Sequence, residues 1–159
     1  MSYTITVNAP ASEKPATNVA ASYVDTSYYA LTKDLTGECQ LTNIQSPIGL
    51  PEILTYRASN IADIYQNSGI DRTLVTPTKR GISVNYHLRQ TWTAADSANP
   101  TAPVYAMPVT ASLTLRIPQN EFISLDNVNA LINKLLGLLY PDGTSSIAAN
   151  IRYALNPKE

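Results

Sequence analysis

The stretch GISVNYHLRQTWT, residues 81–93, decides the fold of this chain because its side chains alternate in character from one residue to the next. Successive side chains of a β-strand point to opposite faces of a sheet. The mainly apolar set is Ile82, Val84, Tyr86, Leu88 and Gln90. The hydrogen-bonding set is Ser83, Asn85, His87, Arg89 and Thr91. The stretch therefore predicts a strand with one apolar and one polar side, and a one-residue slip in its pairing would exchange the two.

The same alternation recurs in two other stretches, which predicts an antiparallel sheet. In residues 52–60, Leu54, Tyr56 and Ala58 share the apolar side, and Thr55, Arg57 and Ser59 share the polar side. In the strand that ends at Ile117, the apolar side holds Val109, Ala111, Leu113, Leu115 and Ile117, and the polar side holds Thr110, Ser112, Thr114 and Arg116. Residues 2–8, 18–24, 28–33 and 39–43 are further strand candidates, and residues 73–76 are β-prone. The pairing of residues 9–35 is left open.

A helical pattern replaces the strand pattern after Pro118. Ser124 is suited to cap a helix, and Asp126 in the first turn complements the helix dipole. A second, shorter helix is predicted over residues 147–155. Strands followed by helices indicate an α+β domain. We therefore treat residues 1–159 as one domain, with N-terminal strands in 1–35, an antiparallel sheet in 39–117 and two helices in 124–155.

The composition limits the classes of protein that fit. Charged residues make up 14% of the chain, below the roughly 25% of an average protein. The net charge is -1, yet residues 72–116 contain five basic residues and one acid. The single cysteine, Cys39, cannot form an intrachain disulfide. The N-terminal residues do not resemble a signal peptide, and no apolar run approaches the roughly 18 residues of a membrane span.

Catalysis is not expected. His87 and Cys39 are the only residues of their types, so the sequence offers no Cys/His metal cluster and no relay of several histidines. Asp63 and Asp71 lie in turn-rich sequence and are interpreted as surface charges. No P-loop or dinucleotide fingerprint occurs. We expect no metal, no cofactor and no small-molecule substrate.

The predicted sheet needs a cover for its apolar side, and the helices are the only cover that the sequence offers. A symmetric dimer would satisfy both this need and an unpaired sheet edge. We therefore predict a dimer interface along the helices, with a self-sufficient two-layer monomer as the alternative. The predicted interface residues are Val128, Leu131, Ile132, Leu135, Leu136, Leu139, Ile147 and Ile151.

Several segments together resemble the coat proteins of single-stranded RNA bacteriophages, the levivirus family. They are CQLTNIQSPIGLPEILTYRAS, RGISVNYHLRQTW, SLTLRIPQNEF, SLDNVNALINKLLGLL and PDGTSSIAANI, within residues 39–155. The resemblance implies an N-terminal hairpin, a five-stranded antiparallel sheet and two C-terminal helices that interlock in a homodimer. It also implies a T=3 icosahedral capsid, assembled in the bacterial cytoplasm, and residence in the virion without contact with a membrane. The loop of residues 94–103, with Asp96, Asn99, Pro100 and Pro103, would surround the symmetry axes of the capsid.

The resemblance further implies that the polar side of the sheet binds genomic RNA, and repression of translation through an operator hairpin occurs in the family. The expected RNA-binding residues are Thr55, Arg57, Ser59, Ser83, Asn85, His87, Arg89, Thr91, Thr110, Ser112, Thr114 and Arg116. Thr110 and Ser112 depart from the best-known members, which carry a tyrosine and an asparagine there. The alternatives are a secreted or pilus-like β-rich adhesion module without RNA binding, a small RNA-binding regulator that never assembles, and a solvated basic surface without a ligand.

Overall fold

The computed structural model describes residues 25–96 and 99–138 and, within residues 95–104, the backbone alone. The chain divides into two compact units. Val24–Gln119 form the sheet unit, and the second unit combines Met1–Tyr23 with Asn120–Glu159.

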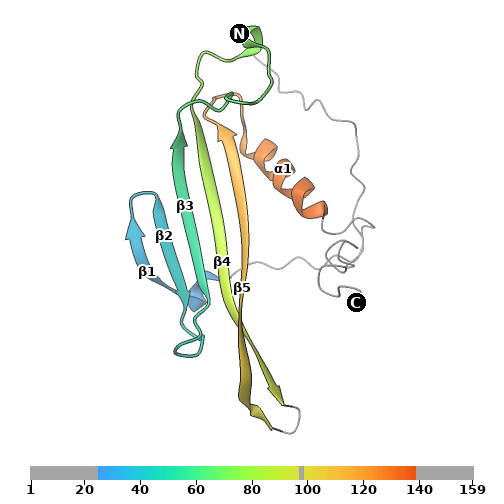
Figure 1. Ribbon diagram of the computed structural model, residues 1–159. Coiled ribbons are helices and arrows are strands. Elements are labelled where there is room, and N and C mark those ends of the chain that lie inside the picture. The colour runs from blue at the N-terminus through green and yellow to red at the C-terminus, as the bar shows by residue number, and fades with distance from the viewer. Residues whose placement is uncertain (1–24, 97–98, 139–159) are drawn as a thin grey trace, which may run out of the picture. The chain divides into compact units, whose positions relative to one another are not determined.

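The sheet unit is a five-stranded antiparallel sheet with the strands in chain order (Figure 1). The strands are β1 (Tyr29–Leu35), β2 (Glu38–Asn43), β3 (Ile53–Ile61), β4 (Gly81–Asp96) and β5 (Asn99–Pro118). Two short 3-10 helices, Thr26–Tyr28 and Arg72–Leu74, lie in the connections. The predicted five-stranded antiparallel sheet is confirmed, but it begins at Tyr29 rather than at residue 39, because β1 pairs with β2.

The turn between β1 and β2 depends on Gly37. Its φ of 80° is a left-handed conformation that side chains disfavour. A Cβ atom at this position would lie 2.7 Å from the carbonyl oxygen of Ala58, which is too close for any real contact. The backbone of β3 therefore approaches this turn closely, and the Ala58 amide donates to the Gly37 carbonyl at 2.8 Å. Glycine is needed here for both reasons.

The strand register groups side chains of like character. Across β3, β4 and β5, Thr55 pairs with His87 and His87 with Ser112. One position along, Tyr56 pairs with Tyr86, and their rings meet edge to face with centroids 5.2 Å apart. Directly opposed residues of antiparallel strands share one face of the sheet. The alternation predicted from residues 81–93 is therefore confirmed by the pairing.

A β-bulge in β1 changes which side chains this strand presents on each face. Leu31 pairs with Leu41, but the next pair is Lys33 with Gln40, so Thr32 is an extra residue. The Thr32 hydroxyl donates to the Gln40 carbonyl at 3.2 Å and lies 3.1 Å from the Thr42 hydroxyl. Lys33 consequently shares a face with Gln40, which the sequence did not predict.

We call the two sides of the sheet the polar face and the apolar face. The polar face comprises Thr32, Lys33, Glu38, Gln40, Thr42, Thr55, Arg57, Ser59, Ser83, Asn85, His87, Arg89, Thr91, Thr110, Ser112, Thr114 and Arg116, with Ala30, Leu35 and Ile53 as apolar members. The apolar face includes Leu31, Cys39, Leu41, Leu54, Tyr56, Ala58, Ile82, Val84, Tyr86, Leu88, Val109, Ala111, Leu113, Leu115 and Ile117.

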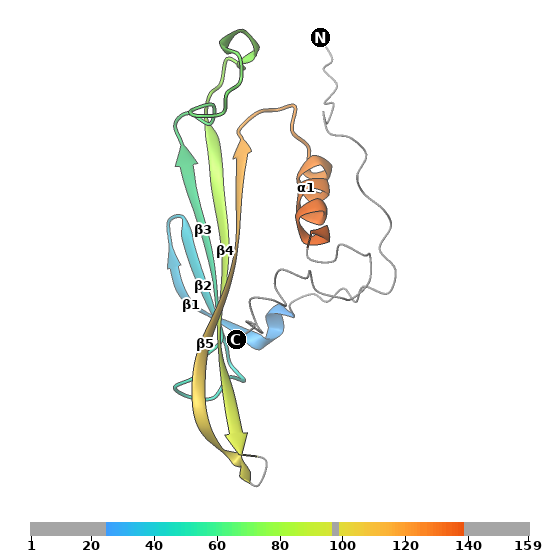
Figure 2. The same ribbon diagram turned by 45° about the vertical axis from the view of Figure 1, so that its right-hand side comes forward.

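The predicted loop over residues 94–103 is wrong. β4 runs to Asp96 and β5 starts at Asn99, and the two remain paired almost to their connection. Because β3 pairs with β4 only as far as Arg89, the remainder of the β4–β5 hairpin extends past the sheet as a two-stranded arm (Figures 1 and 2). β5 is an edge strand, and an edge strand tolerates proline because its outward nitrogens need no partner within the sheet. Small residues and prolines therefore did not interrupt the pairing.

The sequence left the structure of residues 61–80 open, and residues 73–76, although β-prone, do not form a strand. Arg72–Leu74 form a 3-10 helix. The Asp71 carboxylate accepts hydrogen bonds from the Thr73 amide and the Thr73 hydroxyl, both at 2.9 Å. This capping contact outweighs the β-propensity of the segment because none of the described strands pairs with it to supply a ladder.

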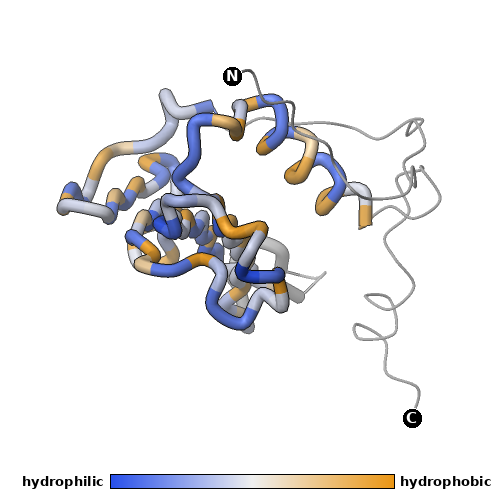
Figure 3. The backbone as a smooth tube through the Cα atoms, turned by 90° about the horizontal axis from the view of Figure 1, so that it is seen from above, coloured by the Kyte–Doolittle hydropathy of each residue, from blue (hydrophilic) through white to orange (hydrophobic). Residues whose placement is uncertain are grey.

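In the second unit, the structure describes one α-helix, α1 (Leu125–Gly137). The Ser124 hydroxyl accepts from the Asn127 amide, and the Asn127 side chain accepts from the Ser124 amide at 3.0 Å, which completes a capping box. The predicted helix start is confirmed. Hydrophobic residues recur along one side of α1 (Figure 3). Leu139, the predicted helix over residues 147–155 with Ile147 and Ile151, and the strand candidates at 2–8 and 18–24 lie outside the described residues.

Burial is shallow in the part of the chain that the structure describes. Leu115, at 6% exposure, is the only hydrophobic side chain there that is buried. On the apolar face, Leu31 and Tyr86 are 56% and 42% exposed. A stable domain normally buries a contiguous cluster of such side chains. The described residues by themselves therefore leave large apolar surfaces to be covered.

Candidate nucleic-acid interface

All twelve residues predicted to bind RNA lie on the polar face, and β3, β4 and β5 supply them. Rows of side chains run across the strands: Arg57, Asn85 and Thr114 form one row, and Thr55, His87 and Ser112 form the next. Arg89 and Thr110 pair in a further row. The polar face is therefore a continuous surface of hydroxyl, amide, imidazole and guanidinium groups. Such groups bind phosphate and sugar oxygens.

Two of these residues are less available to a ligand than the rest. Thr55 is only 7% exposed, so little of its side chain is accessible to a ligand on the polar face. Asn85 Nδ2 donates to the Thr114 hydroxyl at 2.7 Å, which leaves the side-chain oxygen of Asn85 for other partners. The remaining basic side chains Arg57, Arg89 and Arg116 are exposed.

The polar face continues over β2 and β1, which the sequence prediction did not include. Glu38, Gln40 and Thr42 of β2 alternate with Cys39 and Leu41 in the segment ECQLTN. That alternation was a usable signal. Lys33 was not predictable in the same way, because the bulge at Thr32 alone places it on the polar face.

The polar face is positively charged. It carries four permanent cations, Lys33, Arg57, Arg89 and Arg116, and, among the described residues, the single acid Glu38. The Glu38 carboxylate lies 2.9 Å from the Lys33 ammonium and 3.4 Å from Nε of Arg57. The hydrogen bond from Lys33 lowers the pKa of Glu38 below its ordinary value, so that this carboxylate is ionised at neutral pH.

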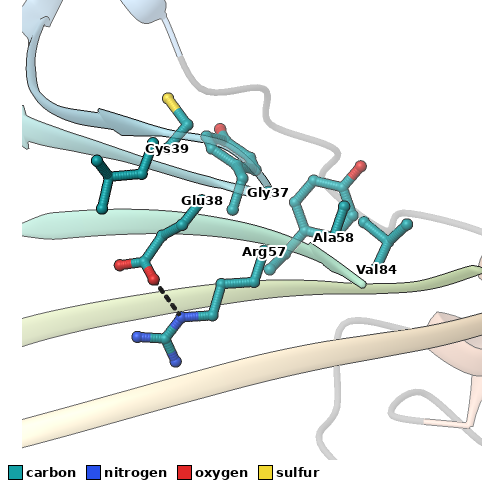
Figure 4. A pocket seen from close by; sticks show the side chains of 9 residues that line it. Gly37, Glu38, Cys39, Arg57, Ala58 and Val84 are labelled. Atoms are coloured by element: carbon teal, nitrogen blue, oxygen red, sulfur yellow. Dashed lines mark ion pairs between the residues drawn. The ribbon is translucent and has the colours of Figure 1, made fainter. Parts of the chain in front are cut away.

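Figure 4 shows the Glu38–Arg57 ion pair on one side of the strands, whereas Cys39 points away from it. A shallow pocket in this region is lined by Cys39, Tyr56, Val84 and Tyr86 of the apolar face and also by Leu35, Glu38 and Arg57 of the polar face. The charged residues of its lining, Glu38 and Arg57, form an ion pair with each other. Within residues 25–96 and 99–138, no cluster of His, Cys, Asp and Glu could hold a metal ion.

Aromatic rings are concentrated away from the polar face. Its strands β3, β4 and β5 contribute no Tyr, Phe or Trp to the described part of that face, whereas Tyr56 and Tyr86 lie on the apolar face. Sequence-specific RNA readers usually stack unpaired bases on aromatic rings. The polar face is accordingly better suited to backbone contacts than to base stacking, with His87 as its one ring.

A hydrogen-bonded network interrupts the apolar face at one end. The Glu52 carboxylate accepts hydrogen bonds from the Tyr29 hydroxyl, from Asn43 Nδ2 at 3.1 Å and from Gln90 Nε2. Trp92 Nε1 donates to Gln90 Oε1 at 3.2 Å. Burial, with the neighbouring carboxylate, raises the pKa of Tyr29 to about 12, and the hydrogen bond from Tyr29 lowers the pKa of Glu52. The network ties β1, β2 and β4 to the segment just before β3.

Comparison with solved structures shows which known proteins share this architecture. The chain matches a virus-like particle of bacteriophage AVE015 with a TM-score of 0.85 and 27% identity, over 99% of this chain and 98% of that one. This chain has the coat-protein fold of the RNA phages. A virus-like particle of bacteriophage GQ-112 shares the fold with a TM-score of 0.77 and 18% identity, over 98% of this chain and 96% of that one. No protein-family model and no curated protein matches the chain.

The coat-protein fold confirms the resemblance noted in the strands and helix of residues 39–155. It also agrees with the five-stranded antiparallel sheet and the helix that follows it. No described helix is long and apolar enough to cross a membrane.

Proposed function

We propose that this chain is the capsid protein of a single-stranded RNA phage, whose copies assemble into a closed shell around RNA. The observation that carries the proposal is the match, over nearly the full length of both chains, to a chain of a phage virus-like particle at 27% identity. A structural role in a capsid would leave no function to a catalytic centre.

The shallow burial supports assembly. A subunit that functions alone rarely exposes so many large apolar side chains. On α1, Leu131, Leu135 and Leu136 are 53%, 42% and 48% exposed, and Val128 and Ile132 belong to the same predicted interface. We propose that this surface packs in a homodimer, as expected for interlocked helices. The remaining predicted interface residues, Leu139, Ile147 and Ile151, would extend it.

The β4–β5 arm offers a second assembly surface. Trp92 pairs with Met107, Ala94 pairs with Tyr105, and all four residues continue the line of the apolar face. Trp92, Tyr105 and Met107 are 58%, 68% and 45% exposed. We propose that the arm contacts neighbouring subunits around the symmetry axes of an icosahedral capsid. Asp96, Asn99, Pro100 and Pro103 lie at its end, where the predicted axis contact would be.

The polar face supports RNA binding on the interior of the capsid. Its four cations and its many hydroxyl and amide groups match the phosphate and sugar oxygens of RNA. Because no Tyr, Phe or Trp stands among the described β3–β5 residues of this face, we favour binding of genomic RNA through its backbone over recognition of an operator hairpin. A pilus-like adhesion module is not favoured, because the coat-protein fold accounts for both the sheet and the helix.

The direct test is to express the full-length chain in bacteria, purify the product and image it by electron microscopy. We expect closed particles that retain RNA after nuclease treatment of their exterior. A monomer in solution would contradict the proposal. A dimer that binds RNA but never forms particles would support a regulator instead of a capsid protein.

A further inference from the structure

We infer that Glu38 is a positioning residue that limits the RNA affinity of the polar face by holding Lys33 and Arg57 in ion pairs. The inference rests on the proposed binding of RNA to this face. It assigns to the single described acid of the polar face a role opposite to that of its cations.

The geometry divides the four cations into two pairs. Lys33 and Arg57 both contact the Glu38 carboxylate, at 2.9 Å and 3.4 Å. Arg89 and Arg116 have no ion pair within the described residues. Arg89 and Arg116 can therefore meet phosphate directly, whereas Lys33 and Arg57 must first exchange one anionic partner for another.

The exchange is feasible because the three side chains are reachable from solvent. The side chains of Lys33 and Arg57 are 42% and 59% exposed, and that of Glu38 is 24% exposed. Exposed ion pairs of this kind contribute little to stability, so a phosphate group can compete for their cations. The Glu38 charge also repels a phosphate that approaches the row of Arg57, Asn85 and Thr114.

The strand register explains why Glu38 can act on both cations. Glu38 pairs directly with Arg57 across β2 and β3. Lys33 stands two residue pairs further along β1, opposite Gln40, because the bulge places it on the same face. A carboxylate between two basic side chains of neighbouring strands reaches each of them without leaving its own strand.

The test compares three variants of the full-length protein with the wild type. Glu38→Gln removes the acid from the polar face. Asp34→Asn is the matched control, because it removes the same charge from an exposed side chain four residues away that pairs with Cys39 and so lies on the opposite face. Glu38→Asp keeps the charge. Each protein is titrated with a fluorescently labelled oligouridylate over a range of salt concentrations, and circular dichroism checks that each is folded.

For Glu38→Gln we expect tighter binding and a steeper dependence on salt. Each freed cation that meets a phosphate of single-stranded RNA adds about 0.7 to the slope of log K against log salt, or about fourfold in affinity at ~0.15 M salt. The gain should thus lie between about fourfold for one cation and about fifteenfold for two. Asp34→Asn and Glu38→Asp should keep the slope of the wild type.

The possible failures are distinguishable. If the wild type binds the oligouridylate but Glu38→Gln binds no more tightly than Asp34→Asn, the role of Glu38 is refuted and the proposed function stands. Weaker binding by Glu38→Gln would also refute it, and would mean that the carboxylate prepares Arg57 for phosphate. If neither the wild type nor Glu38→Gln binds RNA, both the inference and the RNA-binding role of the polar face are wrong.

Discussion

Replacing Tyr29 by phenylalanine should destabilise the sheet in a way that depends on pH. The change deletes the hydroxyl that donates to Glu52 and leaves the ring in place. A hydrogen bond to a charged partner contributes about 1.5–3 kcal/mol. The pKa of Tyr29 rises from its ordinary value of 10.0 to about 12, first because of burial and then because of the hydrogen bond to Glu52. From the hydrogen bond we expect a loss of about 1.5–3 kcal/mol in the free energy of unfolding at neutral pH.

The sign of the pH dependence follows from the direction of the shift. Because the pKa of Tyr29 is higher in the folded chain, its stabilising contribution is complete below pH 10.0 and is lost as the pH rises toward about 12. Glu52 has a lowered pKa, so its contribution is present above its ordinary value of 4.5 and is lost in acid. The difference between the wild type and Tyr29→Phe should therefore shrink between pH 10.0 and about 12.

The chain contains a convenient probe for this measurement. Trp92 is its single tryptophan, and its indole donates to Gln90, which in turn donates to Glu52. Urea unfolding followed by Trp92 fluorescence reports on the network itself. Tyr28→Phe is the control, because Tyr28 is 45% exposed and adjacent in sequence. If Tyr29→Phe and Tyr28→Phe lose the same stability, or if Tyr29→Phe keeps the pH profile of the wild type, the reasoning is refuted.

Three further predictions concern RNA, assembly and folding. Replacing both Arg89 and Arg116 by glutamine should lower the slope of log K for RNA binding against log salt by about 1.4. Particles should still form, but their RNA content, measured by the absorbance ratio, should fall. Unchanged RNA content would count against RNA binding by the polar face. Leu135→Asp places an unpaired charge on the apolar side of α1 and should prevent dimers. A dimer of this variant in analytical ultracentrifugation would show that α1 does not lie at the interface. Gly37→Ala should cost roughly 1 kcal/mol or more in urea unfolding, because it combines a left-handed backbone with a close carbonyl, and a neutral effect would mean that the turn rearranges freely.

Much of the sheet was predictable because its residues alternate over long stretches. In residues 81–93, a shift by one residue would have placed Val84 and Tyr86 among serine, asparagine and arginine, so only one register was acceptable. The same logic placed all twelve candidate RNA-binding residues on one face. The helix start was predictable for a local reason, since Ser124 supplies the cap from within its own turn.

Other features depend on partners that are distant in sequence or on backbone irregularities. The β4–β5 arm forms because each strand supplies hydrogen bonds to the other, which outweighs the turn-forming character of residues 94–103. The role of Glu38 depends on Lys33 and Arg57, and these meet it only through pairing on both sides of β2. The bulge in β1 determines which of its side chains lie on each face. The sequence of β1 contains no alternation that predicts this bulge.

The bulge in β1 affects the electrostatic charge of the polar face. With regular pairing after Leu31, Lys33 would stand opposite Cys39, and Asp34 would point the other way, beside Glu38. The carboxylates of Asp34 and Glu38 would then be neighbours on the polar face, and the Lys33 ammonium would be absent from it. The local charge of the polar face would change from positive to negative with the same amino-acid composition. In this strand the number of residues, as much as their identity, determines whether an anionic polymer meets attraction or repulsion.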